Sequence, residues 1–210
     1  MNLPDFSIEN KYWQEDRTVA GIDEVGRGCL AGPVVAAAVV LPKNKLFSIE
    51  INDSKKLSPQ KRNDLFDLIQ KNAISIGIGI VDSSIIDRIN ILNATFFAME
   101  IAISKLGNIP DIYLIDGNRF SKKSDNYITI IGGDAKSYTI AAASIIAKVV
   151  RDRMMADTFH PAFPEYGFNE HFGYGTQAHF QKIDAYGPCL IHRKYFLKKY
   201  YARKNQLEIF

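Results

Sequence analysis

The chain has 210 residues, of which 47% are hydrophobic and 23% charged, and its formal net charge is +3. These values are typical of one globular domain, or of one domain with a small appendage, and the mild basicity permits a nucleic-acid partner without requiring one. Two cysteines are too few for a disulfide framework, the N-terminus lacks a signal peptide's apolar core, and no apolar run is long enough to span a bilayer. We therefore expect a cytoplasmic protein that does not enter the membrane.

The first part of the chain predicts three strands in series. Residues 18–25, 33–41 and 74–81 are short apolar stretches bounded by turn residues. The loop at 26–32 contains three glycines, and its length suits an antiparallel return. We therefore expect a β-meander.

The pattern then changes to helices alternating with strands. Helical spacing is found in four segments, at 59–71, 83–90, 93–106 and 138–157. Short strands are predicted at 111–115 and 127–131, and this alternation implies parallel pairing through crossovers.

From residue 159 onward, prolines and glycines interrupt the regularity, and one more helix is predicted at 176–186. Residues 193–204 carry six basic residues and no acidic ones, interleaved with aromatics. Such a segment either follows a nucleic-acid backbone or only improves solubility. We expect one domain at 1–158, and a helical, basic segment at 159–210 that packs on it.

Four carboxylates follow the ends of predicted strands. Asp23 and Glu24 close the first strand, Asp116 closes the fourth, and Asp134 follows the fifth. Functional groups of α/β sheets gather at strand ends, so neighbouring strands would bring these acids together. Two like charges about 4 Å apart repel by roughly 4 kcal/mol at an effective dielectric constant near 20. Such a cluster needs cations, and Mg²⁺ or Mn²⁺ suits hard oxygen ligands and phosphodiester chemistry.

Each of these features also has a purely structural interpretation. Asp116 before Gly-Asn and Asp134 after two glycines are typical of turns. The adjacent pair that closes an apolar strand is more often functional. Lys148 and Asp152 lie four residues apart on a predicted helix, where they either form an ion pair or let Asp152 support a metal ligand.

Three further features are candidates for substrate binding. Gly26-Arg27-Gly28 combines a flexible backbone with an arginine fork for phosphate, although an ordinary turn with a solvated arginine has the same pattern. Lys55 lies in a polar run before a predicted helix and is either a phosphate contact or solvated. Tyr174, between two glycines, could stack on a sugar or base, although core packing is the simpler interpretation.

Taken together, these stretches resemble the type 2 ribonucleases H, and the bacterial ribonuclease HII group in particular. The resemblance covers nearly all of residues 18–196. It is carried by eight stretches, at 21–28, 30–34, 53–58, 114–118, 133–134, 140–148, 166–168 and 173–176.

The resemblance implies an α/β, RNase H-like fold, with a mixed β-sheet flanked by helices and a small C-terminal helical extension. It implies that residues 1–158 form the catalytic domain and that residues 159–210 contribute to substrate binding. It implies that Asp23, Glu24, Asp116 and Asp134 are catalytic and bind two Mg²⁺ or Mn²⁺ ions. The implied reaction is hydrolysis of RNA in RNA–DNA hybrids, and of single ribonucleotides embedded in duplex DNA, to give 3′-hydroxyl and 5′-phosphate ends. The family's clamp on the ribose 2′-hydroxyl maps onto residues 26–28, and its junction-sensing tyrosine maps onto Tyr174.

Four positions depart from the family pattern. Cys29 stands where proline is usual, Gly132 and Phe172 stand where lysine is expected, and Tyr195 stands where serine is common. These departures affect the expected backbone contacts and not the reaction. The alternatives are a hybrid-binding protein without catalysis, and a resolvase or DNA exonuclease of the same fold. We expect a monomer, and the sequence leaves open the metal used in the cell, the preference between long hybrids and single ribonucleotides, and any sliding-clamp partner.

Overall fold

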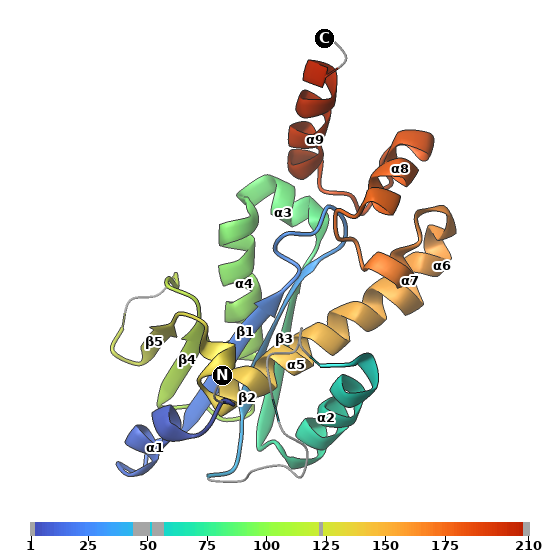
Figure 1. The fold of residues 1–210 in the computed structure, drawn as a ribbon. Coiled ribbons are helices and arrows are strands. Elements are labelled where there is room, and N and C mark those ends of the chain that lie inside the picture. The colour runs from blue at the N-terminus through green and yellow to red at the C-terminus, as the bar shows by residue number, and fades with distance from the viewer. Residues whose placement is uncertain (1–2, 44–50, 52–56, 122–123, 208–210) are drawn as a thin grey trace.

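The structure, a computed structural model, describes residues 3–43, 51, 57–121 and 124–207. A mixed sheet with the strand order β3-β2-β1-β4-β5 forms its centre (Figure 1). The strands are β1 (Val19–Val25), β2 (Val34–Val40), β3 (Ser75–Val81), β4 (Ile112–Asp116) and β5 (Tyr127–Ile130). β1, β2 and β3 pair antiparallel, whereas β4 is parallel to both β1 and β5. The predicted meander and the predicted parallel pairing are both confirmed.

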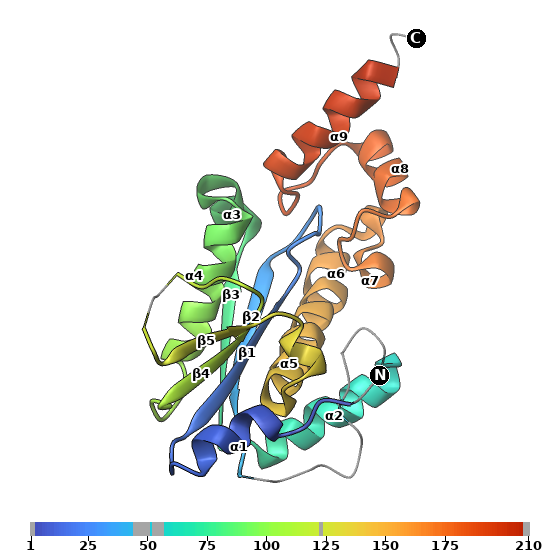
Figure 2. The same ribbon diagram turned by 60° about the vertical axis from the view of Figure 1, so that its left-hand side comes forward.

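Helices cover both faces of this sheet (Figure 2). One face carries α1 (Ser7–Trp13), α2 (Pro59–Asn72) and α5 (Tyr138–Arg153), and the other carries α3 (Ser83–Ile89) and α4 (Ile91–Ser104). All seven residues of β2 are buried, and they alternate between the two hydrophobic clusters. A strand buried on both faces explains why this segment is apolar without interruption.

Glycines set the close approach of helices to the sheet at two places. A Cβ atom on Gly21 would overlap the backbone of Thr139 at the start of α5. On the opposite face, a Cβ atom on Gly79 would overlap the carbonyl oxygen of Ala98 in α4. The alternation of isoleucine and glycine in β3 therefore reflects direct contact between strand and helix backbones.

Two differences from the sequence-based expectation involve α1 and α5. α1 was not predicted, and it buries Glu9, whose Oε1 accepts hydrogen bonds from Ser137 Oγ (2.6 Å) and from the Thr139 backbone N–H (2.9 Å) at the start of α5. The long helix predicted to reach residue 157 ends at Arg153 and continues as a π-helix, Met154–Phe159. In this wider turn, Met155 is fully buried against the loop after β1.

The segment after the π-helix folds into short helices that lie beyond one end of the sheet (Figure 1). They are α6 (His160–Ala162), a 3₁₀ turn (Pro164–Tyr166), α7 (Phe168–His171), α8 (Gln177–Tyr186) and α9 (Lys194–Leu207). This segment has its own hydrophobic cluster, which includes Leu30 and Ala31 from the loop between β1 and β2. Within the described part of the chain, no helix has the length and hydropathy that a membrane crossing requires.

Candidate active site

Three of the predicted carboxylates lie at the ends of neighbouring strands. The parallel register pairs Ile22 of β1 with Ile115 of β4, so Asp23 and Asp116 follow at the same level on adjacent strands. Asp23 is buried, with 5% of its surface exposed, and its Oδ1 accepts a hydrogen bond from the Glu24 backbone N–H at 2.7 Å. β1 therefore delivers one carboxylate to the protein interior and the next to a partly open position.

The environment of Asp23 disfavours its charged form. Burial raises the pKa of this carboxyl well above its ordinary value, and the charges of Glu24 and Asp116 raise it further. Hydrogen bonds from the Ser144 hydroxyl and the Glu24 amide act in the opposite direction and are smaller. Crowded carboxylates of this kind indicate a site that a cation would stabilise.

Asp134 lies on a 3₁₀ turn, Gly133–Ala135, that is attached to this group. The Gly133 backbone N–H donates to Asp116 Oδ1 at 2.6 Å, which fixes the turn beside the end of β4. Gly132 immediately before it has a φ of 63°, in the left-handed region, so glycine suits a position where we expected lysine.

The donor set fits a hard divalent cation, although a closed metal site is not formed. Asp23, Glu24 and Asp116 interact electrostatically and offer carboxylate oxygens, which are the ligands preferred by Mg²⁺ and Mn²⁺. Among the residues that the structure describes, no three His, Cys, Asp or Glu side chains are arranged to hold a metal ion. The roles of the four acids as metal ligands therefore remain predictions.

The Gly26-Arg27-Gly28 turn lies directly beside these acids. Gly26 has a φ of 92°, and a Cβ atom there would overlap the Arg151 side chain, so glycine is required on both grounds. The Arg27 guanidinium forms an ion pair with Glu24, with Nη1 and Oε1 3.0 Å apart, while about half of its side chain is exposed. The predicted juxtaposition of acids and arginine turn is present, with Arg27 directed to a carboxylate.

Two buried arginines hold the loop between β1 and β2 in place, and neither role was expected from the sequence. Arg193, just before α9, donates from Nε (3.0 Å) and Nη2 (2.9 Å) to the Gly32 carbonyl oxygen and from Nη1 (3.0 Å) to that of Arg27. Arg151 on α5 donates from Nε to the Pro33 carbonyl oxygen at 2.9 Å. Burial lowers the pKa of Arg193 to about 10. Because Arg193 is buried, it is not part of the exposed basic surface that we expected from residues 193–204.

Tyr174 lies against the same loop. Its ring is near Lys148, whose Nζ is 5.5 Å from the ring centroid, and it forms a side-chain hydrogen bond with the buried Cys29 thiol. Burial raises the pKa of the Tyr174 hydroxyl to about 12. Cys29, a departure from the family pattern, is therefore a neighbour of the predicted substrate-binding tyrosine.

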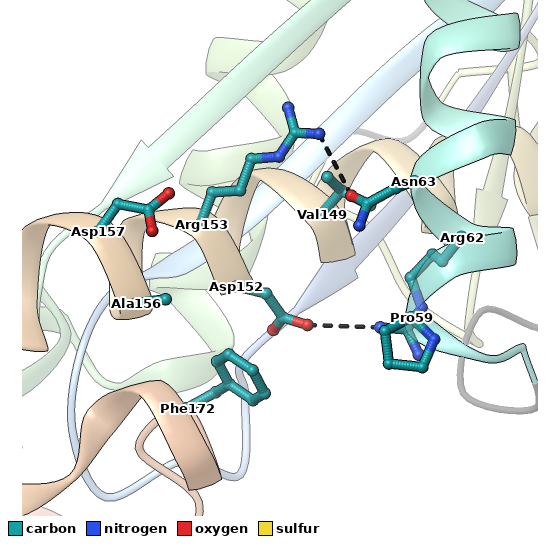
Figure 3. Close-up of a pocket in the computed structure, with 9 residues that line it drawn as sticks. All are labelled: Pro59, Arg62, Asn63, Val149, Asp152, Arg153, Ala156, Asp157 and Phe172. Carbon is teal, nitrogen blue, oxygen red and sulfur yellow. Dashed lines mark hydrogen bonds and ion pairs between the residues drawn. The ribbon is translucent and has the colours of Figure 1, made fainter.

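Asp152 lies in an ion-pair network at the edge of a groove between α2 and α5. Its carboxylate pairs with Lys148 Nζ (2.8 Å) and with Arg62 Nη1 (3.5 Å), which confirms the helical ion pair. Figure 3 shows Asp152 and Arg62 across this groove, with Arg153 and Phe172 along it. A pocket lined by Glu24, Ser144, Arg62, Lys148 and Tyr174 adjoins it, so the groove reaches the carboxylates.

Three further positions were singled out in the sequence, either as a candidate site residue or as a departure from the family pattern. Lys55 lies outside the described residues. Tyr195 is on α9 and is 57% exposed. Phe172 adopts a φ of 49°, and its ring centroid lies 5.2 Å from Lys148 Nζ, so an aromatic ring contacts that ammonium group at the position where we expected a lysine.

Comparison with known proteins agrees with this arrangement. The family model described as Ribonuclease HII matches residues 20–201. Ribonuclease HII from Geotalea uraniireducens is 55% identical over 189 residues, which cover 90% of this chain and 87% of that protein. The crystal structure of ribonuclease H2 from Pyrococcus horikoshii superposes with a TM-score of 0.72 at 27% identity, covering 89% of this chain and 98% of the other.

A second solved structure, the PCNA:RNase HII complex from Archaeoglobus fulgidus, superposes with a TM-score of 0.69 at 25% identity and covers 84% of this chain and 94% of the other. Both superpositions cover more than four-fifths of this chain, with its mixed five-stranded sheet and flanking helices, so the expected RNase H-like fold is confirmed. The chain therefore belongs to the ribonuclease HII family and is a metal-dependent endoribonuclease of the ribonuclease H type.

Proposed function

We propose that this protein cleaves the phosphodiester on the 5′ side of a ribonucleotide, in RNA–DNA hybrids and at single ribonucleotides in duplex DNA. The observation that carries the proposal is the crowding of Asp23, Glu24 and Asp116 at the ends of β1 and β4, directly beside the Gly-Arg-Gly turn. An anionic pocket next to a backbone that can approach a ribose combines metal capture with recognition of RNA.

Asp23, Glu24, Asp116 and Asp134 would hold two Mg²⁺ or Mn²⁺ ions. Such ions supply Lewis-acid activation of the phosphodiester when bound. The protein's own contribution is to fix the carboxylates on rigid strands: β1 and β4 hold Asp23 and Asp116 in register, and the Gly133 amide orients Asp116. Placing ligands on strands limits their movement when the substrate arrives.

Recognition of the ribonucleotide belongs to the loop at 26–28 and to Tyr174. Arg193 holds this turn directly, because its Nη1 donates to the Arg27 carbonyl oxygen. Arg151 holds the far end of the loop at the Pro33 carbonyl oxygen, so the loop backbone is positioned before the substrate binds. A site built to bind a hydroxyl rejects the substrate that lacks it by about 10⁴–10⁵-fold. We therefore propose that the fixed loop discriminates ribose from deoxyribose.

The groove lined by Arg62 and Lys148 is the proposed path of a nucleic-acid backbone. Both side chains are largely buried by their ion pairs with Asp152, and the groove leads to Glu24. We further propose that the segment 159–210 acts as a unit that contributes Tyr174 and a basic α9 to substrate binding. The archaeal relative was solved bound to PCNA, and by analogy we propose a sliding clamp as a partner of this chain.

A nicking assay tests the function. Purified protein with Mg²⁺ or Mn²⁺ is incubated with a DNA duplex that contains one ribonucleotide, with a uniform RNA–DNA hybrid, and with an all-DNA duplex. We expect cleavage of the first two and none of the third. Equal cleavage of all three would favour a DNase of the same fold, and tight binding without products would favour a hybrid-binding protein.

Charge-neutral variants test the site. Asp116→Asn should abolish cleavage with the fold retained, since the amide keeps the acceptor for the Gly133 N–H. Asp67→Asn is the matched control, because it makes the same chemical change at an exposed residue of α2. Full activity of Asp116→Asn would contradict the site, as would an equal loss in the control.

A further inference from the structure

Three histidines are buried together under Tyr174, and the proposed function uses none of them. His179 on α8 and His192 before α9 are 0% and 3% exposed, and His171 at the end of α7 is 9% exposed. The rings of His171 and His179 stack with centroids 4.3 Å apart. Buried imidazoles need hydrogen-bond partners, and the partners here determine where each proton lies.

His192 has a single arrangement of protons. Its Nδ1 lies 2.9 Å from the backbone nitrogen of Cys189, which can only donate. Nδ1 must therefore accept, and the proton of the neutral ring is on Nε2. The Nε2 atoms of His192 and His179 are 3.0 Å apart, so His192 donates across this contact and His179 accepts.

The same logic then fixes His179. Because its Nε2 accepts, its proton is on Nδ1, which lies 2.9 Å from the carbonyl oxygen of Tyr174. A carbonyl oxygen can only accept, so this third contact agrees with the first two. The result is a directed chain of hydrogen bonds that runs from the Cys189 N–H through both rings to the Tyr174 carbonyl oxygen. We refer to this chain as the histidine relay.

The histidine relay ends at the segment that carries the proposed substrate contact. The residue before Tyr174 is fixed as well, because the Gly173 carbonyl oxygen accepts from the Leu30 N–H at 2.8 Å, and the Gly173 N–H donates to His171 Nδ1 at 3.2 Å. Gly173 has a φ of 80°, and a Cβ atom there would lie 2.5 Å from the Ala31 carbonyl oxygen. His171 and His179 thus bind the backbone of the turn at 173–175. Its two glycines have no side chains that could hold the turn in place.

We propose that His179 and His192 are positioning residues for Tyr174, which set the place of its ring at the ribonucleotide site through the Tyr174 carbonyl oxygen. This inference rests on the proposed role of Tyr174 in substrate binding. Both rings act in their neutral forms and transfer no proton to the substrate. Protonation of either ring would place two N–H donors opposite each other at one contact of the histidine relay.

The tautomers provide the first test, and this test does not depend on activity. Long-range ¹H–¹⁵N correlation spectra of the unmodified protein at pH 7 distinguish the two nitrogens of each ring. We expect the proton on Nδ1 of His179 and on Nε2 of His192. The opposite tautomer in either ring, or a charged ring, would overturn the proposal.

Kinetics on a duplex with one embedded ribonucleotide provide the second test. His179→Phe keeps the ring volume and removes both nitrogens, and we expect KM to rise about tenfold with a smaller change in kcat. His179→Asn keeps an N–H donor near the position of Nδ1 and should recover most of the loss. His160→Asn, in a histidine of α6 outside the relay, is the control and should leave both constants unchanged.

A double-mutant cycle with Tyr174→Ala separates positioning from general support of the fold. If His179 acts through Tyr174, His179→Phe causes no further loss in the Tyr174→Ala protein. Fully additive losses from the two substitutions would overturn the proposal. It would also be overturned if His179→Phe lowered kcat as much as it raised KM and His179→Asn gave no recovery. If the wild-type protein does not cleave the embedded ribonucleotide at all, the proposed function fails, whereas the tautomer experiment still decides the geometry of the relay.

Discussion

Replacing Asp23 by asparagine should stabilise the metal-free protein while it abolishes cleavage. Asp23 is buried beside two other carboxylates, which raise its pKa. In the folded protein this carboxyl binds a proton more tightly than in the unfolded chain, so its contribution to stability is complete below the ordinary pKa and is lost as the pH rises through the raised value. At neutral pH the charge is therefore a net cost.

The size of the effect follows from the neighbours of Asp23. Two like charges about 5 Å apart at an effective dielectric constant near 20 repel by roughly 3 kcal/mol. The Arg27 ion pair offsets part of the contribution from Glu24. Asparagine keeps an oxygen that can accept from the Glu24 amide, as Asp23 Oδ1 does. We therefore expect the free energy of unfolding to rise by about 2 kcal/mol and Tm by about 4–8 °C.

Thermal unfolding at pH 7 in a chelator, followed by titration with Mg²⁺ or Mn²⁺, measures both halves of the prediction. Without metal, Asp23→Asn should unfold at the higher temperature. Added metal should raise the Tm of the wild-type protein and have little effect on the variant, because a ligand stabilises only the state that binds it. A variant less stable than the wild type in chelator would refute the electrostatic reasoning, even if the variant were inactive.

Three further predictions concern the packing around the site. Arg193→Met should lower the free energy of unfolding by about 3 kcal/mol, measured by urea unfolding, since it leaves buried carbonyl oxygens without donors, and a change below 1 kcal/mol would contradict this role. Gly79→Ala should cost about 2–3 kcal/mol in the same measurement, because its Cβ would overlap the Ala98 carbonyl oxygen, and a neutral effect would contradict the close approach. The third concerns pH: burial lowers the pKa values of His179 and His192 from 6.5 to about 4, so these rings stay neutral in the folded protein at pH values where the unfolded chain binds protons. The contribution of these two rings to stability should be complete above pH 6.5 and be lost as the pH drops through about 4, and a urea midpoint independent of pH in this range would refute it.

Much of the fold could be predicted because local patterns and tertiary packing agree in this chain. β2 is apolar throughout since both of its faces are covered, and Ser58, directly before α2, caps that helix with its Oγ, which accepts from the Lys61 amide. α1 was missed because its burial depends on Glu9, whose partners Ser137 and Thr139 lie far away in sequence. No local pattern indicates such a contact.

The positions of the candidate catalytic acids could be predicted from the sequence, whereas the residues that hold the site in place could not. The positions of Asp23, Glu24 and Asp116 followed from strand ends, which a sequence reveals through turn residues. The buried arginines could not be recognised, because their partners are backbone carbonyl oxygens and these leave no trace in composition. The contact between His179 and His192 could not be predicted either, because the two rings meet only after α8 and the following turn have folded.

The hydrogen bonds from Arg193 to Gly32 and Arg27 have a consequence for the order in which the enzyme becomes competent. The loop that they hold is made early in translation, whereas the guanidinium that fixes it is added more than 160 residues later. Until residue 193 has been added, the carbonyl oxygens of Gly32 and Arg27 lack these donors. We therefore expect the loop between β1 and β2 to be fixed later than the strands that flank it.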